Sequence, residues 1–162
     1  MLMLQQYRTI MVAVDGSKEA ELAFKKAANV AFRNHAKLIL AHIIDTRAFQ
    51  TVSSFDNILA DQATETAKKT LGEYTEYAKK LGVNEVSYVL EFGSPKSILA
   101  KQLPEEHHVD LLMMGATGLN AVERLFIGSV SEYVIRNAAC DVLIVRTDLE
   151  NKPIKIEKEK NK

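Results

Sequence analysis

The sequence predicts a single α/β domain, a three-layer sandwich in which helices cover both faces of a five-stranded parallel sheet. Short apolar segments alternate with segments of helical period from residue 9 to residue 146. Such apolar runs are typical of parallel strands that are buried on both faces. Strands that alternate with helices imply right-handed crossovers and therefore parallel pairing. The length of 162 residues suits one domain with its own core.

The first half of the chain is expected to form two strands and two helices. The strands are residues 9–14 and 37–44, which are mostly apolar. Residues 20–31 place alanine and phenylalanine at helical spacing, and Ser17 is a suitable N-cap for this helix. A long helix is expected over residues 57–81, because its apolar residues step by three or four along one stripe.

The middle of the chain contains a loop, a helix stop and an edge strand. Residues 45–56 show no clear period and are expected to form a surface loop, with room for a short helical turn. Gly82 is a suitable residue for ending the long helix. Residues 85–91 alternate between apolar and polar, as an edge strand does. Ser94 and Pro95 then fit the cap and the first position of another helix.

The last third of the chain repeats the alternation of helix and strand. The helix that starts at Pro95 is expected to end near residues 104–108, and residues 110–114 form the fourth strand. A further helix is expected over residues 130–138, and residues 141–146 form the last strand. The pattern contains neither an internal repeat nor a second set of alternating elements, so one domain is predicted.

Composition excludes several classes of protein. Lys+Arg and Asp+Glu both number 21, so the chain lacks the basic excess of a nucleic-acid binder. No apolar stretch approaches the length of a membrane span, and residues 1–7 lack the features of a signal peptide. The single cysteine, Cys140, excludes an internal disulfide, so a reducing cytoplasm is expected. The domain is assigned to residues 1–147, and the charged tail, residues 148–162, is expected to be disordered.

The most specific signal is a set of glycines that follows the fourth strand. Gly115 and Gly118 come directly after it, nine residues follow, and Gly128-Ser129 opens the next helix. Glycine lets a ligand approach the backbone closely, and a helix N-terminus presents unpaired N–H groups to an anion. Each glycine alone is explained by an ordinary turn or N-cap, so the prediction of a phosphate site depends on their joint spacing. No phosphate-loop lysine is present, so Arg124, a metal ion or backbone dipoles must supply positive charge.

Three segments are expected to meet at one edge of the sheet. Asp15 follows the first strand, residues 43–45 end the second, and Gly115 follows the fourth. Ligands of open parallel sheets lie beyond the carboxyl ends of the strands, where the strand order reverses. A carboxylate such as Asp15 is suited there to a ribose hydroxyl or an adenine amino group.

The sequence resembles the universal stress protein family over residues 7–146. Residues 12–17 resemble the family's opening strand and turn, and residues 110–118 resemble its fourth-strand signature. The Gly-x2-Gly-x9-Gly-Ser spacing fits its ATP-binding branch. The resemblance implies a flavodoxin-like, Rossmann-like sheet with strand order 3-2-1-4-5. It also implies ATP as the ligand, accompanied by Mg²⁺ because clustered phosphates need neutralising charge.

Carried over by position, the resemblance implies a set of nucleotide-binding residues. The backbone of Ile43 would contact adenine, and the Ser129 hydroxyl would add a donor to the N–H groups that hold the phosphates. The implied set is Ala13, Val14, Asp15, Ile43, Met114, Gly115, Gly118, Gly128, Ser129 and Val130.

The resemblance also implies a homodimer joined through the last strand, Asp141 to Arg146. Residues 142–145 are apolar and would lie at a sheet edge, where pairing with a second copy removes an aggregation hazard. The alternative is that Asp141, Arg146 and the charged tail blunt this edge in a monomer.

Residues that could suggest catalysis have simpler explanations. His42 lies within a buried strand and is expected to be a core histidine, whereas Cys140 is expected to be a small buried hydrophobe. Helix capping explains Ser17. No residue is recognisable as the base that phosphoryl transfer needs, so no catalytic residue is assigned and hydrolysis is expected to be slow at most.

The sequence favours an ATP-binding regulatory protein of the stress response that acts through a downstream protein. Two alternatives remain open. A dimeric interaction module would bind no nucleotide, and a weak ATPase or nucleotidyl transferase would use the same fold for catalysis. Titration with nucleotide distinguishes the interaction module, which would show no binding. Turnover of ATP that Asp15→Ala abolishes would identify the enzyme.

Overall fold

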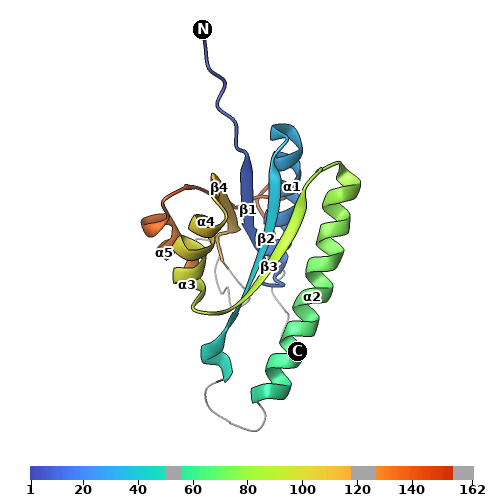
Figure 1. Ribbon diagram of the computed structural model, residues 1–162, viewed down its shortest axis with the longest axis vertical. Helices are drawn as coiled ribbons and strands as arrows, with labels where there is room; N and C mark the ends of the chain where they lie inside the picture. Colours follow the sequence, from blue (N-terminus) through green and yellow to red (C-terminus); the bar gives the residue numbers. More distant parts are fainter. Residues whose placement is uncertain (50–55, 118–126, 155–162) are drawn as a thin grey trace.

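A five-stranded parallel sheet in the order β3-β2-β1-β4-β5 forms the centre of the protein (Figure 1). The computed structural model describes residues 1–49, 56–117 and 127–154. Every neighbouring pair of strands is parallel, so the predicted fold class and strand order are confirmed. The strands are β1 (Thr9–Ala13), β2 (Lys37–Asp45), β3 (Val86–Gly93), β4 (Leu111–Gly115) and β5 (Asp141–Val145).

The helices lie close to the predicted positions. Ser94 and Pro95 begin a continuous helical segment in which the middle turn is π-wound, with the Leu103 N–H bonding to the Ile98 carbonyl. Pro104 follows that turn and has no N–H to donate, which interrupts regular α-helical bonding there. The helices are α1 (Lys18–Asn34), the 3₁₀ turn η1 (Thr46–Phe49), α2 (Asp56–Leu81), α3 (Pro95–Ser97), the π turn η2 (Ile98–Gln102), α4 (Leu103–Glu106) and α5 (Ser129–Asn137).

Helices cover both faces of the sheet, because successive strand residues point to opposite sides. Ile10 and Val12 of β1 face α1 and α2 and belong to the first core. Met11, between them, faces the other side and packs in a second core with the η2, α4 and α5 residues. Figure 1 shows α1 and α2 on one side of the sheet and α3, α4 and α5 on the other.

Aromatic packing joins α1 to α2. Phe24 of α1 is fully buried, and its ring stacks on that of Tyr74 with a centroid distance of 4.3 Å and an interplanar angle of 4°. Tyr77 meets the same ring edge-on at 5.6 Å. This cluster fixes α2 across the sheet and so holds one wall of the site described below.

The segment after β5 differs from the expected disorder in its first residues. Thr147 and Pro153 form an antiparallel bridge, and the Asp148 carboxylate accepts hydrogen bonds from the Glu150 and Lys152 N–H groups. Lys26 of α1 donates to Thr147 Oγ1 at 2.6 Å. Hydrogen bonds, rather than apolar burial, order residues 148–154. Residues 155–162 lie outside the described residues.

The loop expected over residues 45–56 is shorter than predicted at its start. β2 continues through Asp45, and residues 46–49 form the 3₁₀ turn that the sequence allowed for. Residues 50–55 lie outside the described part of the chain. Within the described ranges, none of the helices combines the length and the apolar character that crossing a bilayer requires.

Candidate functional site

The candidate site lies at the carboxyl ends of β1, β2 and β4. β1 pairs with β2 on one side and with β4 on the other, so the strand order reverses at β1. Ligands of open parallel sheets bind at such a switch point. The structure brings Asp15, Ile43 and Gly115 to this edge, because each lies within two residues of the end of one of these strands.

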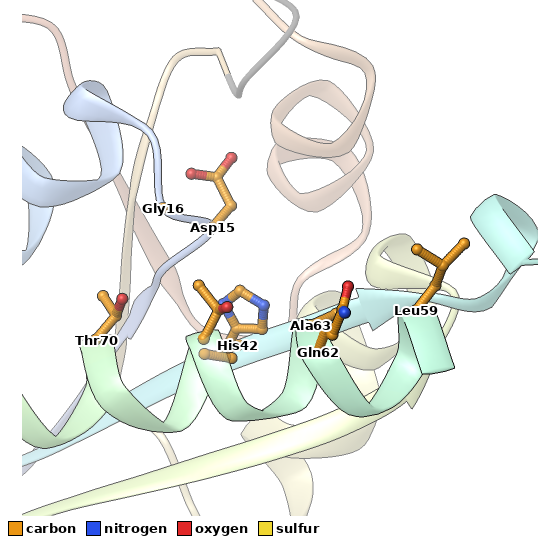
Figure 2. A pocket seen from close by; sticks show the side chains of 9 residues that line it. Asp15, Gly16, His42, Leu59, Gln62, Ala63 and Thr70 are labelled. Atoms are coloured by element: carbon orange, nitrogen blue, oxygen red, sulfur yellow. The ribbon is translucent and has the colours of Figure 1, made fainter. Parts of the chain in front are cut away.

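The turn after β1 holds Asp15 over the site. Val14 is buried, and its N–H donates to the Ala41 carbonyl at 2.8 Å. Gly16 has a φ of 84°, in the left-handed region that favours glycine. The Asp15 Oδ1 accepts the Ser17 N–H at 2.9 Å, so one carboxylate oxygen fixes the turn. Asp15 is one of the residues that line the cavity described below (Figure 2).

Three neighbouring side chains of this turn have structural roles. Ser17 accepts the Ala20 N–H at 3.1 Å, which confirms its interpretation as the N-cap of α1. Val14 belongs to the first core, and Ala13 packs against the second. Ala13 and Val14 therefore offer mainly their backbones to a ligand.

A cavity of about 360 Å³ opens beside Asp15 (Figure 2). It lies between the turn after β1, the middle of β2 and one face of α2. Its volume is within the range of small-molecule sites. The small side chains of Ala63 and Ala67 leave space where larger residues of the α2 stripe would close it. The lining residues are Asp15, Gly16, His42, Leu59, Gln62, Ala63, Thr66, Ala67 and Thr70.

His42 faces this cavity instead of the closed core that the sequence suggested. The side chain is half-buried. Burial lowers the pKa of the imidazole below its ordinary value of 6.5, while the Asp15 carboxylate and a hydrogen bond with the Val14 backbone act in the opposite direction. His42 is therefore neutral at pH 7 and gives the cavity floor a polar, uncharged group.

The backbone of Ile43 extends beyond the end of β1. β1 pairs with β2 only as far as Ala13 opposite Ala41, and the Val14 N–H makes the last bond, to the Ala41 carbonyl. Backbone groups alternate in direction along a strand, so the N–H and C=O of Ile43 point the same way as those of Ala41. They lie past the last residue of β1, where a ligand can pair with both.

Gly115 at the end of β4 has a packing role of its own. A Cβ at this position would lie 3.2 Å from Glu19 Cβ and 3.4 Å from the Glu19 backbone. Glycine here allows α1 to begin close against β4, whether or not a ligand is bound. Met114 beside it is buried in the second core and offers only its backbone to the site.

Gly128 differs from Gly115, because no neighbouring atom among the described residues requires a glycine there. Its φ is −62°, and a Cβ would make only ordinary contacts, 3.4 Å from the Ala116 carbonyl oxygen and 3.5 Å from Thr117 Cα. Gly128 is the N-cap of α5 and contributes no capping side chain. The first N–H groups of the helix, which lack partners inside it, are thus left to other acceptors.

The first residues of α5 complete the described part of the predicted phosphate site. Ser129 is exposed at the start of the helix, and Val130 packs partly against the second core. The Gly128 N–H donates to the Ala116 carbonyl at 2.7 Å, which brings the start of α5 to the end of β4. Gly118 and Arg124 of the predicted site lie outside the described residues.

Groups that could support other chemistry are few in the described ranges. Burial raises the pKa of the Cys140 thiol, which keeps it protonated and poorly nucleophilic. Among the described residues, no group of three or more His, Cys, Asp or Glu side chains is arranged to hold a metal ion.

Sequence comparison identifies the family. The sequence profile of the universal stress protein family matches residues 6–146, nearly the whole domain. The chain belongs to the universal stress protein family. A protein of Staphylococcus aureus strain USA300 that carries the family's name is 49% identical over 142 residues, which cover 88% of this chain and 86% of that protein.

Solved structures of universal stress proteins have the same fold. The universal stress protein UspA from Lactobacillus plantarum superposes with a TM-score of 0.79 at 27% identity, covering 88% of this chain and all of that one (100%). A universal stress protein solved in complex with cAMP superposes with a TM-score of 0.66 at 29% identity, covering 87% of this chain and 98% of that one.

Two parts of the site were not predicted from the sequence. The α2 residues that line the cavity belong to a stripe with helical period, and that period is the same for a stripe that fills a core and one that borders a cavity. Ser131, which bonds to the Gly115 carbonyl, was not singled out. Its position in the first turn of the helix after the Gly128-Ser129 motif is the one signal that could have indicated it.

Proposed function

We propose that this universal stress protein binds ATP at the carboxyl ends of β1, β2 and β4, and that nucleotide occupancy regulates its interaction with a downstream protein in the cytoplasm. Adenosine occupies the edge of the sheet beside Asp15, with the adenine paired to the Ile43 backbone. The phosphates extend along Met114, Gly115 and Gly118 toward Gly128, Ser129 and Val130. The cAMP complex of a related protein supports an adenine nucleotide as the ligand class.

The observation that carries this proposal is the contrast between the two glycines. Packing against Glu19 accounts for Gly115, but neither the backbone angles nor the neighbouring atoms of the described residues account for Gly128. A glycine N-cap leaves the N–H groups of α5 open to an anion that approaches closely. This open helix N-terminus lies at the end of β4, next in the sheet to the strand that presents Asp15.

A divalent cation fits the charges at this edge. Asp15 and Glu19 are both carboxylates near the ends of β1 and β4 and would repel a triphosphate. Mg²⁺ commonly binds through phosphate oxygens, waters and one or two carboxylates rather than through a protein cage. Asp15 and Glu19 are the described candidates for such contacts, and the ion would supply neutralising charge. The protein's role in the proposal is binding, with hydrolysis slow at most.

Two variants of Gly128 test the phosphate assignment. Asp and Asn are both good N-caps, and the extended angles of Gly128 suit either, so Gly128→Asp and Gly128→Asn should fold as well as the parent. Only aspartate brings a negative charge to the phosphates. We expect Gly128→Asp to bind ATP at least about fivefold more weakly than Gly128→Asn in calorimetric titrations with Mg²⁺, because like charges in contact cost about 1 kcal/mol or more.

Adenosine serves as the internal control, since it lacks phosphates and should bind both variants equally. ATP binding to Gly128→Asp as tight as to Gly128→Asn would contradict the phosphate assignment. Failure of the well-folded parent to bind any adenine nucleotide would instead favour an interaction module without nucleotide. Substantial turnover of ATP that Asp15→Ala abolishes would favour an enzyme.

We also propose that the protein is a homodimer joined through β5, residues Asp141 to Arg146. β5 is an edge strand, and Leu143 within it is 39% exposed. A lysine on an edge strand opposes pairing with another chain. Leu143→Lys should therefore convert the dimer to a monomer in light scattering, whereas Leu149→Lys, an exposed leucine outside the sheet, should not. A parent that is monomeric at all concentrations would refute this proposal.

A further inference from the structure

Ser131 makes a buried hydrogen bond between two elements of the nucleotide site. It lies in the first turn of α5 and is 4% exposed. Its Oγ donates to the carbonyl of Gly115, the last residue of β4, at 2.9 Å. The two residues are 16 positions apart in sequence. The hydroxyl therefore connects the strand end to the helix N-terminus across the segment that contains Gly118.

A second hydrogen bond joins the same elements through the backbone. The Gly128 N–H donates to the Ala116 carbonyl at 2.7 Å. The first turn of α5 is thus tied to the two residues, Gly115 and Ala116, with which the chain leaves the sheet. Of these two connections, only the one from Ser131 is made by a side chain, so it can be removed without changing the backbone.

We propose that Ser131 is a positioning residue for phosphate binding, which fixes the N-terminus of α5 relative to the end of β4. The inference rests on the proposed function. Ser131 does not contact the nucleotide through its hydroxyl, because that group is buried and its proton is used by Gly115. It acts through the orientation of the N–H groups at Ser129 and Val130.

The geometry explains why this contact affects phosphates more than adenosine. Hydrogen bonds weaken steeply with distance and angle, so a small shift of α5 reduces every N–H contact to the phosphates together. Without the hydroxyl, the buried Gly115 carbonyl loses this hydrogen bond, and α5 can move to admit water there. The adenosine side of the site is built from the turn at Asp15, β2 and α2, none of which bonds to Ser131.

The test compares ATP with adenosine. Titration of both ligands into the full chain with Mg²⁺ gives a ratio of affinities that isolates the phosphate contribution. In Ser131→Ala we expect ATP to bind about three- to tenfold more weakly, the effect of one hydrogen bond, with adenosine unchanged. Ser131→Thr, which keeps the hydroxyl, should restore the parent ratio.

A control removes a comparable hydroxyl elsewhere. Thr75 of α2 donates to the Leu71 carbonyl at 2.7 Å, away from α5, and Thr75→Val should leave the ratio unchanged. Circular dichroism and thermal melting establish that each variant is folded. Ser131→Cys, which preserves the side-chain volume with a weaker donor, gives the same comparison if the alanine variant unfolds.

The outcomes separate this inference from the proposed function. A parent that binds ATP, together with Ser131→Ala that keeps the parent ratio of ATP to adenosine affinity, would overturn the role of Ser131 alone. Equal weakening of both ligands would also overturn it, since that result describes a general structural role. A folded parent that binds neither ligand would overturn the proposed function and this inference with it.

Discussion

Replacing Asp15 with asparagine tests how the site recognises a nucleoside. The turn should survive, because the asparagine side-chain oxygen can accept the Ser17 N–H as the Asp15 Oδ1 does at 2.9 Å. What changes is the charge of the group offered to the ligand. A hydrogen bond to a charged group contributes about 1.5–3 kcal/mol and a neutral one about 0.5–1.5 kcal/mol, so the substitution removes about 1 kcal/mol.

This free energy corresponds to about fivefold weaker binding. Adenosine is the appropriate ligand for the calorimetric titration, since removing a carboxylate also reduces repulsion of the phosphates of ATP. Asp61→Asn is a matched control, because Asp61 is exposed on α2 and does not line the cavity. If Asp15→Asn bound adenosine as tightly as the parent and as Asp61→Asn, the assignment of Asp15 to the nucleoside would be wrong.

Three further predictions concern stability and are checked by urea unfolding. His42 has a pKa below 6.5 when folded, so the unfolded state binds more protons and the free energy of unfolding should fall as the pH drops below about 6.5. His42→Gln should reduce this dependence of the free energy of unfolding on pH. An unchanged dependence would refute the assignment of the lowered pKa to His42. Phe24→Leu should cost about 1–3 kcal/mol, because the buried ring loses its stacking on Tyr74 and leaves a space, whereas a loss below about 0.5 kcal/mol would contradict this packing. Gly72→Ala should raise the free energy of unfolding by up to about 1 kcal/mol, because alanine favours the helix and its added Cβ meets no atom of the described residues within 4 Å; a decrease would show an unrecognised contact.

Local signals were sufficient for the elements of the fold. Continuous apolar runs marked the buried strands, and the alternating pattern of residues 85–91 marked β3 as an edge strand, as the sheet confirms. Ser17 capped its helix as predicted, because N-capping depends on a residue and its next three neighbours. The strand order, by contrast, followed from the family resemblance, since alternation alone does not specify which strands are neighbours.

Interactions between distant residues were decided by the tertiary structure. Helical period cannot distinguish a stripe that fills a core from one that borders a cavity, so the role of the α2 face and of His42 emerged only when β2 and α2 were placed together. The need for glycine at position 115 arises from Glu19, and the Ser131 hydroxyl bonds to a carbonyl 16 residues away. Sequence patterns report on neighbours along one element, whereas a binding site forms where several elements meet. The glycine spacing therefore predicted the class of ligand. The packing around those glycines decided which side chains connect the strands and helices of the candidate site.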